Sequence, residues 1–325
     1  MQHLTRRRAL AITGIALTSF SGLALGQAYP SRPIRLVVPN PPGGLTDTVS
    51  RMLTPRLQSA LGQSVVVDNK PGANGGVAAS NLATSPADGY TFIVADGSML
   101  TVNPLVSSKL SYDPKKDFVP VSLLGQAPLF LAVHPKLGVN SFDELVALAR
   151  SKPGKLNYGS SGIGSQHHLT MEALKGSLKL DITHIPFKGS SASVPALVGG
   201  EVDMVFSAYP SLAGFAKAGQ VRLLAVNSSK RWPQEANVPA IAEKVPGFDY
   251  APNLILIART GTPAETIQRM SDELARIAKQ SDLIESMRTA GITYVGGSPQ
   301  DLAAALQREG EQMIATAKLA NLKPE

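Results

Sequence analysis

The chain has 325 residues, of which 43% are hydrophobic and 17% charged, and a chain of this length usually divides into two domains with substantial cores. It contains no cysteine, which excludes disulfides, thiolate metal sites, cysteine nucleophiles and a lipid anchor on an N-terminal cysteine. The formal net charge is +7, but three of the arginines lie in residues 1–28, and the remaining excess of +4 is spread without a basic, aromatic-rich run, which argues against a nucleic-acid partner.

The N-terminus has the pattern of an export signal. Arg6, Arg7 and Arg8 are followed by a mildly apolar stretch without charge until Arg32, and the small residues GQA end at Ala28. We expect residues 1–28 to be a signal peptide cleaved near Ala28, which predicts a periplasmic protein. A membrane anchor is the alternative, but the stretch is only weakly hydrophobic. The segment TRRRAL also resembles a twin-arginine signal, so the export route stays open.

Strand-like and helix-like segments then alternate. Between residues 29 and 125 the pattern predicts strands at 34–39, 64–69 and 90–95, with helices at 48–62 and 76–85. The order strand, helix, strand favours a parallel sheet covered by helices.

A second run of the same kind follows from about residue 125. Ser141 and Glu144 have the spacing of a capping box at the start of a helix. The predicted strands are 129–134, 156–161, 183–189, 202–208 and 221–227, and the predicted helices are 141–154, 165–177 and 193–200.

The last part contains a strand at 253–258, two charged amphipathic helices, a strand at 292–297 and a helix at 299–321. Pro263 is predicted in the first turn of its helix, where a missing N–H does no harm. We expect two α/β lobes, one from residues 29–125 and 250–325 and the other from 126–249. The discontinuous division rests partly on the family resemblance given below.

Three strand–loop–helix junctions are rich in Gly, Ser or Pro: PPGGLTD, YGSSGIGSQHHLT and FKGSSASVPAL. The first N–H groups of a helix lack partners and carry partial positive charge, and glycine lets the backbone approach a ligand. A carboxylate or phosphate suits such junctions, which gather at the carboxyl ends of strands. The alternative is that they are ordinary turns and caps, which any α/β protein needs.

Some side chains at these junctions allow two interpretations. Thr46 and Asp47 have the pattern of N-caps, but Asp47 could instead accept a hydrogen bond from an amine or a water molecule. His168 is either a hydrogen-bond donor to a ligand or a packed histidine. Lys188 is either a carboxylate partner or a solvated lysine. Ser207, at the end of its strand, is a further candidate for the binding cleft.

Enzyme motifs are not met. Ser161 has Gly159 two positions before it but Ile163 two after it, so the nucleophile elbow fails. Dinucleotide and Walker loops are missing, and His167 and His168 are adjacent and would point about 100° apart on a helix. A secreted hydrolase using Ser161 or Ser165 with His168 is the alternative from another class. We expect no metal and no cofactor.

At these same residues the chain resembles the Bug-type receptors, the periplasmic solute-binding components of tripartite tricarboxylate transporters. The resemblance extends over nearly the whole chain after residue 28, and it is carried by VVPNPPGGLTD, DNKPGANGGVAASNLATSPADGYTFIV, YDPKKDFVPVSLL, LNYGSSGIGSQHHLTMEALK, HIPFKGSSASVPALVGGEVDMVF and VRLLAVNSSKRWPQEANVPAIAE. Two segments depart from the family pattern: Asn40, where an apolar residue is frequent, and APNLILIA, where an aromatic-rich stretch is frequent. These departures leave the ligand's identity open.

The resemblance implies a two-lobed Venus-flytrap binding protein of the type II-like kind, each lobe a mixed, mostly parallel sheet flanked by helices, without catalysis. It implies a monomer that binds an organic acid, whether di- or tricarboxylate, amino acid or aromatic acid. The implied site residues are Pro42, Gly43, Gly44, Thr46, Asp47, Asp96 and Ser98 in one lobe, and Ser160, Ser161, Gly164, Ser165, His168, Lys188, Gly189, Ser190 and Ser207 in the other. The partners would be permease subunits or, alternatively, a sensor kinase ectodomain.

Overall fold

The computed structural model describes residues 29–322 and residue 324. The predicted signal peptide lies outside these residues. Within the described part of the chain no helix is both long and apolar enough to cross a bilayer.

The first lobe is built on a six-stranded sheet with the order β11-β4-β10-β3-β1-β2. Strand β1 pairs in parallel with β2 and β3, whereas β10, β4 and β11 are joined by antiparallel pairing. The strands are β1 (Ile34–Val38), β2 (Val65–Asn69), β3 (Thr91–Asp96), β4 (Phe118–Gln126), β10 (Asn253–Arg259) and β11 (Thr293–Gly297). Its helices are α1 (Leu45–Leu61), α2 (Gly76–Thr84), α3 (Ser98–Thr101), α4 (Asn103–Val106), α9 (Ala264–Ile277), α10 (Ser281–Thr289) and α11 (Pro299–Leu319).

The second lobe is built on a five-stranded sheet with the order β7-β6-β8-β5-β9. Its strands are β5 (Leu129–Val133), β6 (Asn157–Ser160), β7 (Thr183–Pro186), β8 (Met204–Ala208) and β9 (Arg222–Val226), and its helices are α5 (Phe142–Ser151), α6 (Gln166–Leu178), α7 (Ser190–Val198) and α8 (Tyr209–Lys217). Short 3-10 turns occur at Ala73–Gly75, Pro135–Leu137, Pro233–Glu235 and Ile241–Glu243. Both sheets are mixed, as expected, but the antiparallel share is larger than the strand–helix alternation predicts.

The central strands of the first lobe are buried on both faces. Leu36, Val94 and Leu256 belong to the core under α1, α9 and α10. Their neighbours Val37 and Ile93 point to the other face, toward α2 and α3. This alternation follows from the two-residue period of a strand, and each such side chain contributes roughly 1.5–3 kcal/mol on burial.

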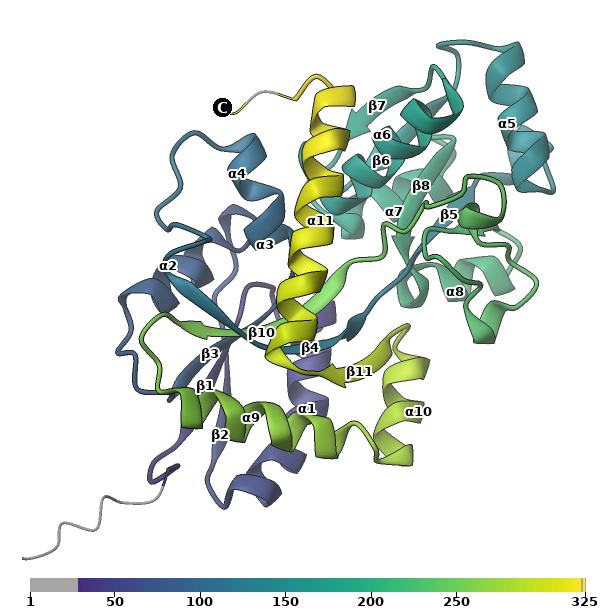
Figure 1. Ribbon diagram of the computed structural model, residues 1–325. Helices are drawn as coiled ribbons and strands as arrows, with labels where there is room; N and C mark the ends of the chain where they lie inside the picture. Colours follow the sequence, from purple (N-terminus) through teal and green to yellow (C-terminus); the bar gives the residue numbers. More distant parts are fainter. Residues whose placement is uncertain (1–28, 323, 325) are drawn as a thin grey trace, which may run out of the picture.

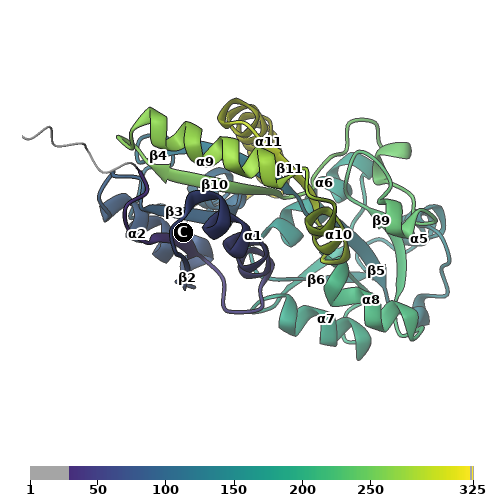
Figure 2. The same ribbon diagram turned by 90° about the horizontal axis from the view of Figure 1, so that it is seen from below.

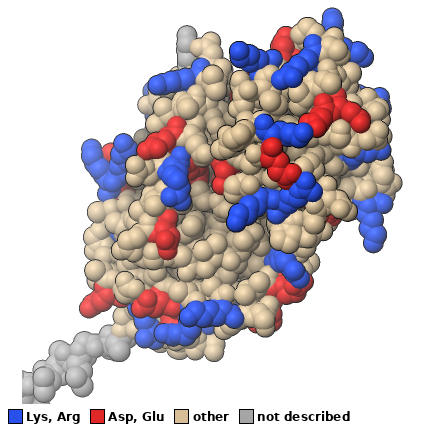
Figure 3. Space-filling model, turned by 45° about the vertical axis from the view of Figure 1, so that its right-hand side comes forward, with Lys and Arg blue, Asp and Glu red and all other residues tan. Residues whose placement is uncertain are grey.

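The two lobes lie side by side and are joined at two neighbouring crossings (Figures 1 and 2). The N–H of Ala127 donates to the carbonyl of Pro252 at 3.1 Å, and Gln126 Nε2 donates to Asn253 Oδ1 at 3.3 Å. Helix α11 adds a third connection, since it runs from the first lobe to pack against α6 of the second (Figure 1). Lys, Arg, Asp and Glu are interspersed over the face that Figure 3 shows.

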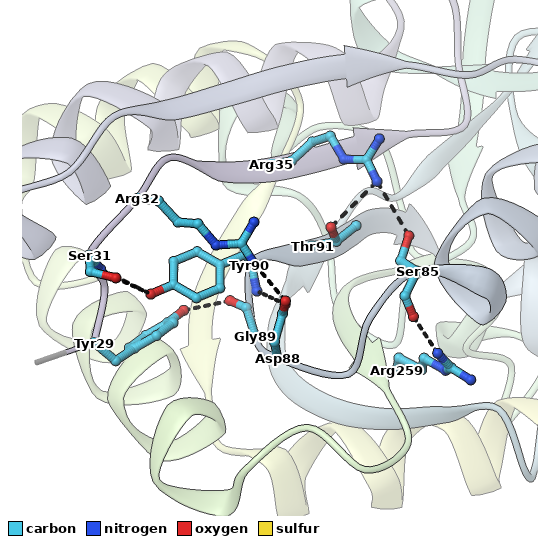
Figure 4. A network of polar contacts seen from close by, with 10 residues as sticks. All are labelled: Tyr29, Ser31, Arg32, Arg35, Ser85, Asp88, Gly89, Tyr90, Thr91 and Arg259. Carbon is cyan, nitrogen blue, oxygen red and sulfur yellow. Dashed lines mark hydrogen bonds and ion pairs between the residues drawn. The ribbon is translucent and has the colours of Figure 1, made fainter. Parts of the chain in front are cut away.

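Polar contacts close the first lobe at the amino ends of β1 and β3, opposite the edge where ligands bind in such sheets (Figure 4). Tyr29 Oη donates to the carbonyl of Gly89 at 2.7 Å. Arg32 pairs with Asp88 at 2.5 Å, and its guanidinium lies 4.1 Å from the centre of the Tyr90 ring. These contacts hold the start of the described chain against the sheet.

Several local predictions are confirmed and others are wrong. Ser141 caps α5, but Glu144 accepts from the N–H of Asn140 at 2.7 Å instead of completing a box with Ser141. Helix α1 begins at Leu45, earlier than predicted, and Pro263 occupies the N-cap of α9 instead of its first turn. Strand β4 and helix α8 were not predicted.

Candidate ligand-binding site

The first candidate loop joins β1 to α1. Gly43 has a left-handed backbone with φ +84°, and Gly44 occupies the N-cap with extended geometry. The N–H groups of Leu45, Thr46 and Asp47 find no acceptor among the described residues. Together with the helix dipole, they make this helix start a donor site for an anion. Pro42 precedes it as an exposed residue.

Asp47 holds this loop from behind. Its Oδ2 accepts from the N–H of Gly43 and from Arg51 Nε, both at 2.8 Å, and its Oδ1 accepts from Asn69 Nδ2 at 2.9 Å. Burial alone would raise the pKa of Asp47, but these hydrogen bonds and the charge of Arg51 lower it to about 2. The carboxylate therefore stays ionised and is occupied within the protein.

The prediction that Thr46 and Asp47 are N-caps is wrong, because Gly44 has that position and no side chain caps it. Thr46 Oγ1 instead donates to Asn40 Oδ1 at 2.6 Å. Asp47 is the third helical residue, and its carboxylate reaches back past the N-cap to the N–H of Gly43. Both side chains are buried and fix the loop geometry.

The end of β3 adjoins the same loop. Asp96 Oδ1 accepts from the N–H of Ser98 at 3.0 Å and from its hydroxyl. Asp96 and Asn40 line one cavity of about 130 Å³. The structure thus brings two predicted segments of the first lobe together.

The segment from Pro71 to Gly75 lines this cavity too, and the sequence prediction missed it as a site element. It joins β2 to α2, and Asn74 adopts a left-handed backbone with φ 46°. Asn74 Nδ2 donates to Asn103 Oδ1 at 2.6 Å, which holds this conformation. A proline and several glycines between a strand and a helix, as in the other loops, were the signal that could have identified it.

In the second lobe the loop between β6 and α6 is fixed by its own hydroxyl groups. Ser165 caps α6 by accepting from the N–H of His168 at 3.2 Å, and its Oγ donates to the carbonyl of Gly162 at 2.7 Å. Ser161 Oγ lies 2.5 Å from His167 Nδ1. The N–H groups of Gln166 and His167 find no acceptor among the described residues, so a second helix start offers donors.

His168 lies behind this loop in a stack of rings. Its Nδ1 accepts from the N–H of Gly164 at 3.1 Å, and its ring centre lies 4.0 Å from that of His184. His184 stacks in turn on Tyr158 at 4.7 Å, and its Nε2 lies 2.7 Å from Ser160 Oγ. Burial lowers the pKa of His168, while Glu172 raises it and Lys175 lowers it. These contacts support the loop, and Nδ1 of His168 bonds within the protein instead of to a ligand.

The third loop joins β7 to α7 and lies against the second one. The N–H of Phe187 donates to the carbonyl of Ser160 at 3.1 Å, and the N–H of Gly189 to that of Ser161 at 3.3 Å. Gly189, with φ +95°, is the N-cap of α7, and the N–H groups of Ser190 and its neighbour find no acceptor among the described residues. Lys188 is exposed beside this helix start.

Ser207 lies near the carboxyl end of β8 and is fully buried. Its Oγ has no hydrogen-bond partner among the described residues. A buried hydroxyl without a hydrogen bond is destabilising unless a ligand or a water molecule bonds to it. Ser207 is therefore still a candidate ligand-binding residue.

The second lobe touches the first at the loop before α6. A Cβ built on Gly164, whose φ is +72°, would lie 2.8 Å from Val106 Cγ1 of α4. Val102, Leu169 and Met313 form a small buried cluster beside this contact. No hydrogen bond among the described residues joins a predicted site residue of one lobe to a predicted site residue of the other.

The geometry argues against the alternative of a secreted hydrolase in which Ser161 or Ser165 acts with His168. Among the described residues, no hydrogen bond joins either hydroxyl to a ring nitrogen of His168, and Nδ1 of that ring accepts from the N–H of Gly164 instead. The close pair is Ser161 with His167, and no carboxylate among the described residues orients that imidazole by a hydrogen bond. Within residues 29–322, no group of three or more His, Asp or Glu residues is arranged to hold a metal ion.

Known proteins resemble this chain over most of its length. The chain is 35% identical over 315 residues to the UPF0065 protein in the tcbD-tcbE intergenic region of Pseudomonas sp. strain P51, which covers 96% of this chain and 94% of that protein. It is 35% identical over 297 residues to protein BugT of Bordetella pertussis, covering 90% and 91%.

Solved structures show the same fold. Rpa4515 of R. palustris, determined with adipate, superposes with a TM-score of 0.83 at 37% identity and covers 91% of this chain and 100% of that chain. MatC (Rpa3494) from Rhodopseudomonas palustris, determined with bound malate, has a TM-score of 0.75 at 30% identity and covers 89% and 99%. The profile of the family described as "Tripartite tricarboxylate transporter family receptor" matches residues 49–322. The chain therefore belongs to the tripartite tricarboxylate transporter receptors, a family of periplasmic solute-binding proteins.

Proposed function

We propose that this protein captures a small molecule with a carboxylate group between its two lobes and presents it to the permease subunits of a tripartite tricarboxylate transporter. The observation that carries the proposal is the set of helix starts at α1, α6 and α7. Each begins with N–H groups that lack an acceptor among the described residues. The adipate and malate in two related structures are ligands of this class.

Capture works through closure. Each lobe supplies part of the ligand's hydrogen bonds, so a bound ligand favours the closed arrangement by its higher affinity for it. The crossings near Ala127 and Pro252 are the short segments about which the lobes would turn. The permease subunits then bind the closed, ligand-loaded conformation.

The test is a thermal-shift screen of mono-, di- and tricarboxylates, amino acids and aromatic acids, followed by calorimetry on the hits. A ligand at 100 times its Kd stabilises the fold by about 2.7 kcal/mol. We expect carboxylates to raise Tm and matched alcohols or sugars not to. A rise with sugars alone would overturn the proposal.

Gly44→Val tests the first loop. A Cβ there would lie 3.0 Å from Asn40 Cβ and 3.2 Å from the carbonyl oxygen of Pro41, so a branched side chain displaces the loop. We expect at least a tenfold loss of affinity with a modest loss of stability. Gly214→Val is the matched control, because a Cβ at Gly214 meets open space. Unchanged affinity in Gly44→Val would remove this loop from the site.

A further inference from the structure

The cavity beside the first-lobe helix start is large enough for one end of a small molecule. Its volume of about 130 Å³ equals that of roughly four water molecules at about 30 Å³ each. It lies where the loops after β1, β2 and β3 meet. The chemistry of its lining therefore decides which group a ligand presents to the first lobe.

Asp96 brings an uncompensated charge to this cavity. Its Oδ1 is occupied by Ser98, whereas its Oδ2 has no donor and no cation among the described residues. Within residues 29–322 no cation lines the cavity, and Lys70, which precedes Pro71 of the lining in the sequence, pairs with Asp68 at 3.5 Å. Arg51 likewise pairs with a buried carboxylate of α1.

The rest of the lining supplies only neutral donors, among them the N–H groups of Gly72, Asn74 and Met99, which find no acceptor among the described residues. Pro39, Pro41 and Pro71 have no N–H, and the N–H of Gly75 is already bonded to the carbonyl of Gly72. Asn74 donates its Nδ2 to Asn103, so its Oδ1 remains as an acceptor. The amide of Asn40 supplies a neutral donor, which does not offset the charge of Asp96.

A second carboxyl group lies behind the cavity. Gly97 packs directly against the carboxyl group of Glu309, which is hydrogen-bonded by Thr101 and Asn253 and has no ion pair among the described residues. The charge of Asp96 is one of the causes that raise the pKa of Glu309, so the two carboxyl groups interact. A ligand carboxylate placed here would meet like charge.

We propose that the ligand carries a protonated amine as well as its carboxylate, and that Asp96 binds the amine while the helix starts bind the carboxylate. This inference rests on the proposed function and narrows its substrate class to amino-carboxylates. An ammonium group supplies three donors, which suit Asp96 Oδ2 and Asn74 Oδ1. A dicarboxylate of the same length would place its second carboxylate against Asp96.

The experiment compares matched ligands by calorimetry at pH 7.5 and low salt. The pairs are 5-aminopentanoate with adipate, 4-aminobutanoate with glutarate, glutamate with glutarate, aspartate with succinate, and leucine with 4-methylpentanoate. We expect at least one amino acid to bind at least tenfold more tightly than its partner. The chosen pair is then measured with variants.

Asp96→Asn keeps an oxygen for Ser98 and removes only the charge. We expect it to lower the affinity for the amino acid at least tenfold and to leave or raise that for the partner without the amine. Glu285→Gln is the control, since it removes an exposed carboxylate from the same lobe, where Glu285 pairs with Arg288. Its affinities should match those of the unmodified protein, and circular dichroism checks that both variants fold.

Three results would overturn the inference, and they are distinguishable. Binding of dicarboxylates in preference to amino acids would reject the amine and leave the carboxylate proposal standing. An unchanged preference in Asp96→Asn would reject the role of Asp96. If no carboxylate of either kind binds, the proposed function itself fails.

Discussion

Glu309 Oε2 accepts a hydrogen bond of 2.6 Å from Asn253 Nδ2, and this contact joins the middle of α11 to the point where the chain re-enters the first lobe. Thr101 Oγ1 donates to the other carboxyl oxygen at 2.8 Å. Glu309 is 5% exposed, and burial raises its pKa to about 7 against the lowering effect of both hydrogen bonds. A carboxyl group at the junction of the lobes thus titrates near neutral pH.

The first prediction concerns stability against pH. Glu309 ionises near pH 4.5 in the unfolded chain and only near pH 7 in the folded chain. The free energy of unfolding therefore falls as the pH rises through this window, and the whole loss is present above pH 7. From pH 5 to pH 8, the free energy of unfolding of Glu309→Gln should rise by about 2–3 kcal/mol relative to that of the unmodified protein. Urea unfolding at both pH values measures this gain.

Glu311→Gln is the control for that experiment. Glu311 lies on the same helix and is exposed, and among the described residues it accepts only from Gln307. Its replacement should shift stability equally at the two pH values. If Glu309→Gln behaves in the same way, Glu309 does not titrate between them.

The second prediction concerns Asp47. Its folded pKa of about 2 lies below the ordinary 3.8, so its contribution is present above about pH 4 and is lost as the pH falls through 2. Asp47→Ala should cost about 2–3 kcal/mol at pH 7, because it removes charge-assisted hydrogen bonds to Gly43, Arg51 and Asn69.

The loss in Asp47→Ala should shrink at pH 2.5, and ligand affinity should fall as the loop loosens. Denaturant unfolding and calorimetry measure the two effects. Glu265→Ala, at an exposed carboxylate in the first turn of α9, is the control. Equal stability of Asp47→Ala and the unmodified protein at pH 7 would contradict the supporting role.

The sequence predicts best where a local pattern and a tertiary need coincide. Strand β1 and the Ser141 cap follow from apolar runs and capping chemistry that act within a few residues. Strand β4 escapes prediction because Pro120 and Gly125 interrupt its pattern. Pro120 lies beside a register shift against β10, and a Cβ on Gly125 would meet the carbonyl of Thr293.

The contacts that support the candidate site join residues far apart in the sequence, so local sequence patterns could not predict them. Nothing in the sequence of α11 marks Glu309 as buried, because its burial depends on the packing of the helix against Gly97, Thr101 and Asn253, which are far away in the sequence. His168 and His184 lie on different elements, and only the fold stacks them. The loop glycines were identifiable, since a helix start needs them locally.

The third prediction tests closure at Gly164. Gly164→Ala places a methyl group 2.8 Å from Val106 Cγ1 and strains a left-handed backbone by roughly 1–2 kcal/mol. We expect weaker ligand binding and a larger radius of gyration in the ligand-bound form, measured by X-ray scattering. Val106→Ala should restore part of both in the double variant, since it removes the contacts with Cγ1 and Cγ2 but keeps Val106 Cβ at 3.2 Å and leaves the backbone strain.

A double-mutant cycle isolates the contact between the lobes. The coupling energy is expected to be about 0.5–3 kcal/mol in favour of the double variant, as for residues in contact. Val106→Ala alone should bind ligand nearly as the unmodified protein does. Strict additivity would mean that Gly164 is required only for its backbone geometry.

The last prediction concerns the histidine stack. Burial, with the charge of His168 adding to it and Glu172 opposing it, lowers the pKa of His184 to about 4. The folded state therefore prefers the neutral ring, and the stability this provides is present above about pH 6.5 and is lost as the pH falls toward 4. When the pH falls from 7.5 to 5, the free energy of unfolding of His184→Gln should decrease by about 2 kcal/mol less than that of the unmodified protein. Urea unfolding measures the difference, with His134→Gln, which lies outside the stack, as the control. An equal loss in all three proteins would show that the stack does not titrate in this range, and the acid sensitivity of the second lobe would then need another source.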